Sequence, residues 1–141
     1  MLKSRQGNSV ETLFFVMIFV LTLLGGVEIS RAYAIRHAMD SGTAIAARQL
    51  SLDPSAWSTA VSTVQSTVNA NFLGGNYGSS VSVTALDSGG GTLSSAAVNA
   101  LSFGTVFRVR STLSLTVVSP MLGSFAKNLQ VEHWSIIERY P

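Results

Sequence analysis

The fold is decided by the stretch Thr12–Val27 (TLFFVMIFVLTLLGGV), sixteen uncharged residues bounded by Glu11 and Glu28. At 1.5 Å per residue, a helix of this length spans roughly 24 Å, slightly less than the roughly 30 Å hydrocarbon core of a bilayer. We therefore expect a membrane-spanning helix whose ends rely on flanking polar side chains or on protein neighbours. A buried helix of a soluble protein is the alternative, although little else in the chain is large enough to wrap it.

The composition of the chain agrees with a membrane or polymer subunit. Of 141 residues, 47% are apolar and only 11% are charged, an imbalance that a small soluble domain can hardly hide from water. The net charge of +2 comes from scattered basic residues, so nucleic acid is not an expected partner. Cysteine is absent, which excludes disulfides and thiol chemistry but leaves the compartment open.

The helix should continue well beyond the apolar run. No helix breaker follows Glu28 until Gly42, and the Ala-rich sequence extends helical character to about Leu50. We predict one helix over residues 9–50, preceded by a short polar tail at residues 1–8. Small side chains recur along it at four-residue spacing, at Gly26, Ser30, Ala34, Ala38, Gly42 and Ala46. This small-residue ridge would let another helix approach closely, or it lies under the protein's own head.

Several residues at the two ends of the apolar run have two interpretations each. Glu11 is a costly carboxylate near lipid that needs a partner, or an ordinary charge favoured by the helix macrodipole. Glu28 and Arg31 form a solvated pair within the helix, or an ion pair between staggered subunits. Gly25 and Gly26 mark a helix bend or local melting at the edge of the bilayer, or a place of close helix packing.

Residues 51–141 predict a small head. Asp53 is the expected N-cap and Pro54 takes the first helical position, and the helix then runs to Gly74–Gly75. Its apolar face contains Trp57, Val61, Val64, Val68 and Phe72.

Three strands follow in the head, at 79–86, 103–119 and 129–139. The second alternates apolar and polar residues as a half-buried antiparallel strand does, and Pro120 ends it before a connection at residues 121–128. The last has apolar residues on both faces, which indicates that it is sandwiched. Residues 92–101 are ambiguous between a helical turn and a loop. The fold class is therefore α+β: a long helix, then a head with one helix and a three- to four-stranded antiparallel sheet.

The residues that usually carry catalysis form no pattern here. His37 and His133 have no Cys or carboxylate at metal-ligand spacing, and the glycine-rich stretches lack the strand and helix that flank a phosphate-binding loop. No Ser, His and Asp grouping stands out. We expect no enzyme activity, no cofactor and no metal.

The stretch RQGNSVETLFFVMIFVLTLLGGVEISRAYAIRHAMDSGTAIAARQL (residues 5–50) resembles the TadE/TadG-like minor pilins of tight-adherence pilus systems. The likeness consists of a Gly, a Val-Glu pair, a hydrophobic stretch, and then a Glu, an Arg-Ala-Tyr and an Ala-rich helix. Its beginning also has the form of a class III, type IV pilin-like signal. The closing stretch LTVVSPMLGSFAKNLQVEHWSIIER (residues 115–139) is similar to that family more loosely.

This resemblance implies that a prepilin peptidase cuts the chain after Gly7. It also implies that Glu11 neutralises the new amino terminus of a neighbouring subunit. The family usually places the Glu five residues after the Gly, whereas here the spacing is four, so cleavage after Gln6 and no cleavage are the alternatives. Ala32-Tyr33-Ala34 matches the A-x-A pattern of signal peptidase, which would release the head instead.

The resemblance further implies a single-pass protein of the inner membrane with a cytoplasmic N-terminus, then a filament at the cell surface. Basic residues on the two sides of the apolar run nearly balance, so the positive-inside rule does not decide the orientation. The implied partners are other copies of the chain or other pilins, membrane lipid before assembly, and a pilus assembly ATPase with its platform. The alternative is a membrane-anchored minor pseudopilin or binding module of a secretion or pilus machine that is not itself the filament.

Overall fold

The computed structural model describes residues 3–71, 76–119 and 123–138, with side chains from residue 9 onward except at 118, 119 and 125. The predicted α+β class is confirmed. The elements are α1 (Lys3–Leu52), α2 (Trp57–Ala70), the 3₁₀ turn η1 (Gly78–Ser80), β1 (Ser82–Asp87), β2 (Thr92–Leu93), α3 (Ser95–Asn99), β3 (Val106–Ser119) and β4 (Gly123–Ile136).

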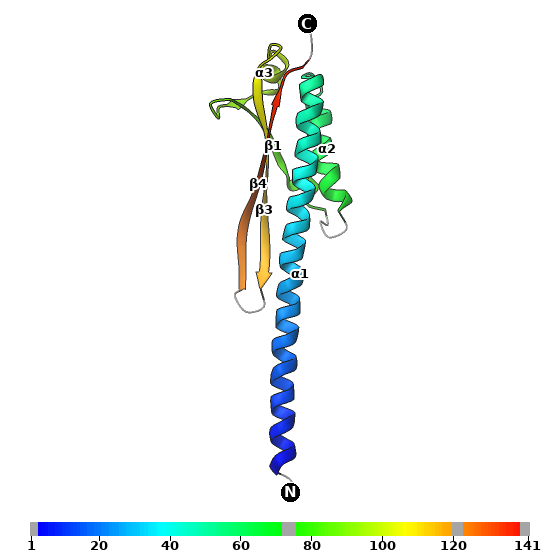
Figure 1. Ribbon diagram of the computed structural model, residues 1–141, viewed down its shortest axis with the longest axis vertical. Coiled ribbons are helices and arrows are strands. Elements are labelled where there is room, and N and C mark those ends of the chain that lie inside the picture. Colours follow the sequence, from blue (N-terminus) through cyan, green and yellow to red (C-terminus); the bar gives the residue numbers. More distant parts are fainter. Residues whose placement is uncertain (1–2, 72–75, 120–122, 139–141) are drawn as a thin grey trace.

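Helix α1 dominates the shape of the molecule. Its 50 residues correspond to roughly 75 Å at 1.5 Å per residue. It begins at Lys3, six residues before the predicted start, because residues 3–8 contain no proline to oppose the helix. It ends at Leu52, just before Asp53 and Pro54, where the ring of Pro disfavours helical geometry in the preceding residue. The C-terminal half of α1 lies between α2 and the sheet, while its N-terminal half projects away from both (Figure 1).

Helix α2 starts three residues later than predicted. Its N-cap position is Ala56 and not Asp53, and no side chain caps it. The carboxylate of Asp53 instead accepts from the backbone N–H of Ser55 at 3.0 Å and from its hydroxyl, a local turn that competes with helix geometry. Further along, Ala60, Val64 and Val68 are buried, one turn apart on the face towards α1. Phe72, Gly74 and Gly75 lie outside the described residues.

The sheet has the strand order β2-β1-β3-β4, all antiparallel. Strands β3 and β4 pair along their whole length from Val106↔Ile136 to Ser119↔Gly123, and their hairpin extends alongside α1 towards the N-terminal end of the molecule (Figure 1). The predicted alternation of β3 is confirmed, because its residues 107, 109, 113, 115 and 117 are all buried. At the opposite end of β4, Ser51 Oγ donates to the Ile136 carbonyl at 2.5 Å and Glu138 N–H to the Ser51 carbonyl at 2.9 Å.

Strand β4 differs from its prediction in two ways. It begins at Gly123, so most of the expected connection at 121–128 is strand. The local sequence there lacks a strong strand pattern, and pairing with β3 overrides it. The inference that this strand is sandwiched is wrong, because Trp134 and Ile136 are 59% and 42% exposed on its second face. The ambiguous stretch 92–101 contains β2 and the short helix α3, whose N-cap Ser94 accepts from Ala97 N–H at 3.2 Å.

The core of the head includes much of α1. Ile35, Met39, Ala46 and Leu50 are fully buried and pack in one cluster with buried residues of α2, β1, β3 and β4. The division at residue 51 between the predicted helix and head segments therefore runs through a continuous core. From Ile35 onward, α1 belongs to the head.

Candidate functional site

The N-terminal half of α1 is an apolar surface that the rest of the chain leaves uncovered. Apart from the half-buried Leu21, the large hydrophobic residues from Val10 to Ile29 are exposed, between 40% for Ile18 and 73% for Leu13. The most apolar window of this helix has a mean hydropathy of 2.3, and none of it is buried. Within the part of the chain that the structure describes, α1 is the one helix long and apolar enough to cross a membrane. Exposure excludes the alternative of a buried helix of a soluble core within this chain.

The predicted processing and assembly residues lie at the beginning of this surface. Gln6 and Gly7 are in the first turns of α1, and their side chains lie outside the described residues. Glu11 is exposed on the same helix. The Ala32-Tyr33-Ala34 triplet is inside the unbroken helix, with Tyr33 73% exposed.

The small-residue ridge is divided between two environments. Its upper part packs within the head: a Cβ on Gly42 would meet the Val64 Cα of α2 at 3.1 Å, and Ala38 and Ala46 are buried. The lower part is open, because Ser30 is exposed and a Cβ on Gly26 would meet nothing within 4 Å. The head therefore covers the upper half of the ridge, while close approach of another helix to the lower half stays a prediction. α1 runs through Gly25 and Gly26 without a break, and the whole helix is drawn without a sharp kink (Figure 1).

Arg31 connects α1 to the segment after α2. Its Nη1 lies 3.6 Å from Glu28 Oε1, while Nη2 donates to the hydroxyl of Tyr77 and the guanidinium stands 5.0 Å from that ring's centroid. Glu28 and Arg31 thus pair within one helix, about one-third exposed. Tyr77 was not predicted, since nothing in its sequence neighbourhood marks it as a partner of a residue 46 positions away.

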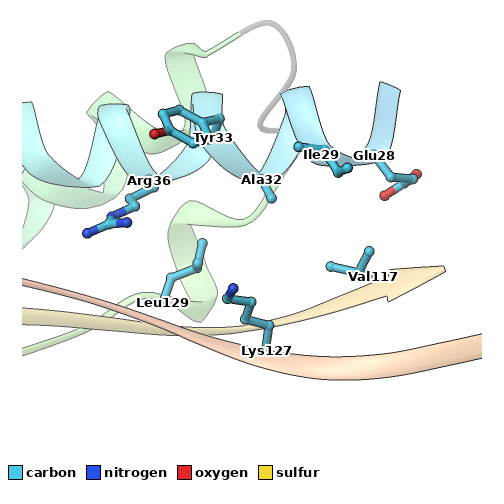
Figure 2. A pocket seen from close by; sticks show the side chains of 8 residues that line it. All are labelled: Glu28, Ile29, Ala32, Tyr33, Arg36, Val117, Lys127 and Leu129. Atoms are coloured by element: carbon cyan, nitrogen blue, oxygen red, sulfur yellow. The ribbon is translucent and has the colours of Figure 1, made fainter. Parts of the chain in front are cut away.

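A groove separates α1 from the β3–β4 hairpin, next to the apolar surface. Its volume is about 260 Å³ and its lining includes Ile29, Ala32, Val117 and Leu129 as apolar residues, with Glu28, Arg36 and Lys127 at its margins. Figure 2 shows Lys127 reaching from β4 towards α1, and Arg36 extending from α1 towards the strands. Sequence reasoning missed this groove, because residues of α1 and β4 far apart in the chain create it.

The two histidines lie apart from each other in the sequence but both near Asp40. His133 Nε2 is 2.9 Å from Asp40 Oδ1, which connects β4 to α1, and His37 lines a shallow depression with Tyr33, Arg36 and Asp40. Among the described residues, no group of three or more His, Cys, Asp or Glu side chains is placed to hold a metal ion.

The outer face of the sheet has a charged cluster around Glu132. Arg110 Nε lies 2.6 Å from Glu132 Oε1, and Arg108 Nη1 lies 3.2 Å from Oε2. The hydrogen bond from Arg110 is the main cause that lowers the pKa of Glu132, and the charges of both guanidiniums lower it further. Arg108 also stacks 4.5 Å from the centroid of the Trp134 ring. This cluster links β3 to β4 across the strand pair.

Protein-family models, curated proteins and solved structures give no match to this chain. The chain has a long N-terminal apolar helix whose second half is packed on a small antiparallel sheet. This is a pilin-like architecture. Because the head leaves it uncovered, α1 from Val10 to Ile29 is the candidate functional surface.

Proposed function

We propose that this chain is a non-catalytic structural subunit that assembles through the exposed half of α1 into an extracellular filament of the tight-adherence, type IV-like kind, for attachment to surfaces. Before assembly it is stored in the inner membrane, with its N-terminus in the cytoplasm. The observation that carries the proposal is the apolar surface from Val10 to Ile29, which the head leaves uncovered.

The energetics of this surface require a partner outside the chain. Burying one large apolar side chain contributes about 1.5–3 kcal/mol, so leaving the whole surface in water would be strongly unfavourable. Lipid removes that cost in the membrane. Passing from lipid to a bundle of helices gains little from the hydrophobic effect and depends on close van der Waals packing, which small residues permit. Gly26 and Ser30 offer such a place, since they are not covered by the head.

The test compares Gly26→Leu with Gly25→Leu in the bacterium that makes the protein. Neither added side chain meets anything within the chain at its Cβ, and both changes alter helix propensity and hydropathy equally. Only Gly26 lies on the small-residue ridge. We expect Gly26→Leu to reduce the amount of this chain in filaments sheared from the cells, while Gly25→Leu leaves it near the wild-type amount.

One result decides between the filament subunit and its alternative, and a second identifies the cleavage site. If this chain stays in the membrane fraction while intact filaments form in its absence, it is an anchored minor pseudopilin or binding module, and the filament proposal fails. Mass spectrometry of the N-terminus from the same filaments identifies a first residue after Gly7, after Gln6, or at Met1. A chain that begins at Met1 excludes cleavage by a prepilin peptidase, whose role here is proposed from resemblance, as are those of the assembly ATPase and platform.

A further inference from the structure

Two cationic side chains that line the groove between α1 and the β3–β4 hairpin have no acidic partner among the described residues. They are Arg36 of α1 and Lys127 of β4, which are 91 positions apart in the chain. Both reach into the space between helix and strands (Figure 2). Within the described residues, neither makes a hydrogen bond or ion pair. The acids nearby already have partners, because Glu28 pairs with Arg31 and Asp40 with His133. Two cationic side chains that line one groove without acidic partners of their own are matched by a negatively charged ligand.

The groove also has an apolar floor, which a free anion does not need. Ile29 and Ala32 of α1 face Val117 of β3 and Leu129 of β4 across it. Ile29 remains 66% exposed, so this floor is accessible from the side of the apolar surface. A ligand that combines a negative group with an apolar part would contact both the cations and the floor.

The position of the groove along α1 identifies the source of such a ligand. The apolar run ends at Val27, and a hydrocarbon core of about 30 Å extends a few ångströms past each end of a helix of roughly 24 Å. Ile29 then lies at the boundary of the hydrocarbon. Residues two turns further along lie in the headgroup layer, where basic side chains and Tyr gather. Arg36 and the exposed Tyr33 are at this depth.

We propose that the groove binds the headgroup of an anionic phospholipid while the chain is in the membrane. The phosphate lies between Arg36 and Lys127, and the start of the acyl chains covers Ile29 and Val117. This inference rests on the membrane-stored stage of the proposed function. The bound lipid holds the hairpin against α1 at the bilayer surface and is left behind when the subunit is extracted.

The test uses the full chain in nanodiscs of phosphatidylcholine with a minor fraction of phosphatidylglycerol. Native mass spectrometry then counts the lipids that stay on the protein after ejection from the disc. We expect one retained lipid with a preference for phosphatidylglycerol. Arg36→Gln and Lys127→Gln should each reduce that preference about fivefold, as expected for one cation near an anionic surface. The double variant should remove it.

Arg48→Gln is the matched control, because it removes the same charge from α1 about three turns further into the head, where Arg48 pairs with Glu138. It should keep the wild-type preference. Arg36 and Lys127 are exposed, so the variants should also keep the wild-type unfolding temperature.

Four outcomes would overturn the inference. The first is a wild type that stays in the disc without preferring phosphatidylglycerol, and the second is a double variant that keeps this preference. The third is an Arg48→Gln control that loses the preference. The fourth is lipid-free chain in detergent that binds inorganic phosphate through Arg36 and Lys127. The last would assign the groove to a free anion. A wild type that does not stay in the disc at all contradicts membrane anchoring, which is a failure of the proposed function and is distinct from the first outcome.

Discussion

At the scale of single residues, the contact between α1 and the sheet contains a buried pair of hydroxyls. Thr43 and Ser111 are both fully buried, and their oxygens are 2.7 Å apart. Thr43 Oγ1 is also 2.6 Å from the Met39 carbonyl. The Thr43 hydroxyl has one proton, which it donates to the Met39 carbonyl because a carbonyl can only accept. The Ser111 hydroxyl therefore donates to Thr43 Oγ1. All polar groups of the pair are thereby satisfied inside an apolar core.

Thr43→Val should destabilise the head by about 1–3 kcal/mol, because it keeps the volume but leaves the buried Ser111 hydroxyl without its partner. The measurement is the unfolding temperature of the full chain in detergent. Ser111→Ala alone should cost less, since Thr43 keeps its bond to the Met39 carbonyl. The double variant should recover part of the loss, and strictly additive effects in this double-mutant cycle would contradict coupling between the two hydroxyls.

Glu132 makes the stability of the head depend on acid pH. The Arg110 hydrogen bond lowers its pKa in the folded state, below the ordinary value of about 4.3 for an unfolded chain. The stabilisation is therefore complete above about pH 4.3 and is lost as the pH falls below it, through the folded pKa. Thermal unfolding across this range should show wild type losing stability relative to Glu132→Gln. Arg110→Gln should weaken the same acid dependence, and an unchanged dependence would exclude this ion pair as its cause.

At the scale of elements, the sequence predicts regular patterns well and long-range partners poorly. The apolar run from Thr12 to Val27 and the alternation of β3 are strong local signals, and both elements form as expected. The first part of β4 has no such signal and becomes strand only because β3 pairs with it. The start of α2 was misplaced because Asp53 accepts from Ser55 in a local turn, where the sequence equally fits an N-cap.

The candidate site follows the same rule. Its apolar surface lies within one helix, so the sequence alone identifies it. The groove depends on bringing α1 next to β4, and the partner of Arg31 is a Tyr after α2. Residues that meet from different elements have no fixed spacing along the chain, so the sequence does not predict these contacts. The sequence shows the four-residue period of the small-residue ridge, but it does not show which half the head covers. That depends on the docking of α2 against Gly42.

At the scale of the whole molecule, the two halves of α1 have opposite relations to the fold. From Ile35 onward one face of α1 is part of the core, whereas the large apolar residues before Glu28 contact no other element closely enough to be buried. A sequence so apolar and so exposed contributes nothing to holding the head together. Under the proposed function, this surface contacts lipid before assembly and neighbouring subunits afterwards.

This division predicts how truncation affects folding. A chain of residues 28–141 should fold as a soluble monomer, with an unfolding temperature within a few degrees of the full chain's. A chain of residues 53–141 should not fold, because it lacks Ile35, Met39 and Leu50, which are fully buried and together contribute roughly 5–9 kcal/mol, as much as a small domain's total stability. Circular dichroism and analytical ultracentrifugation measure both. An unfolded 28–141 chain would show that the apolar half of α1 supports the head. Assembly would then no longer be needed to explain the apolar surface.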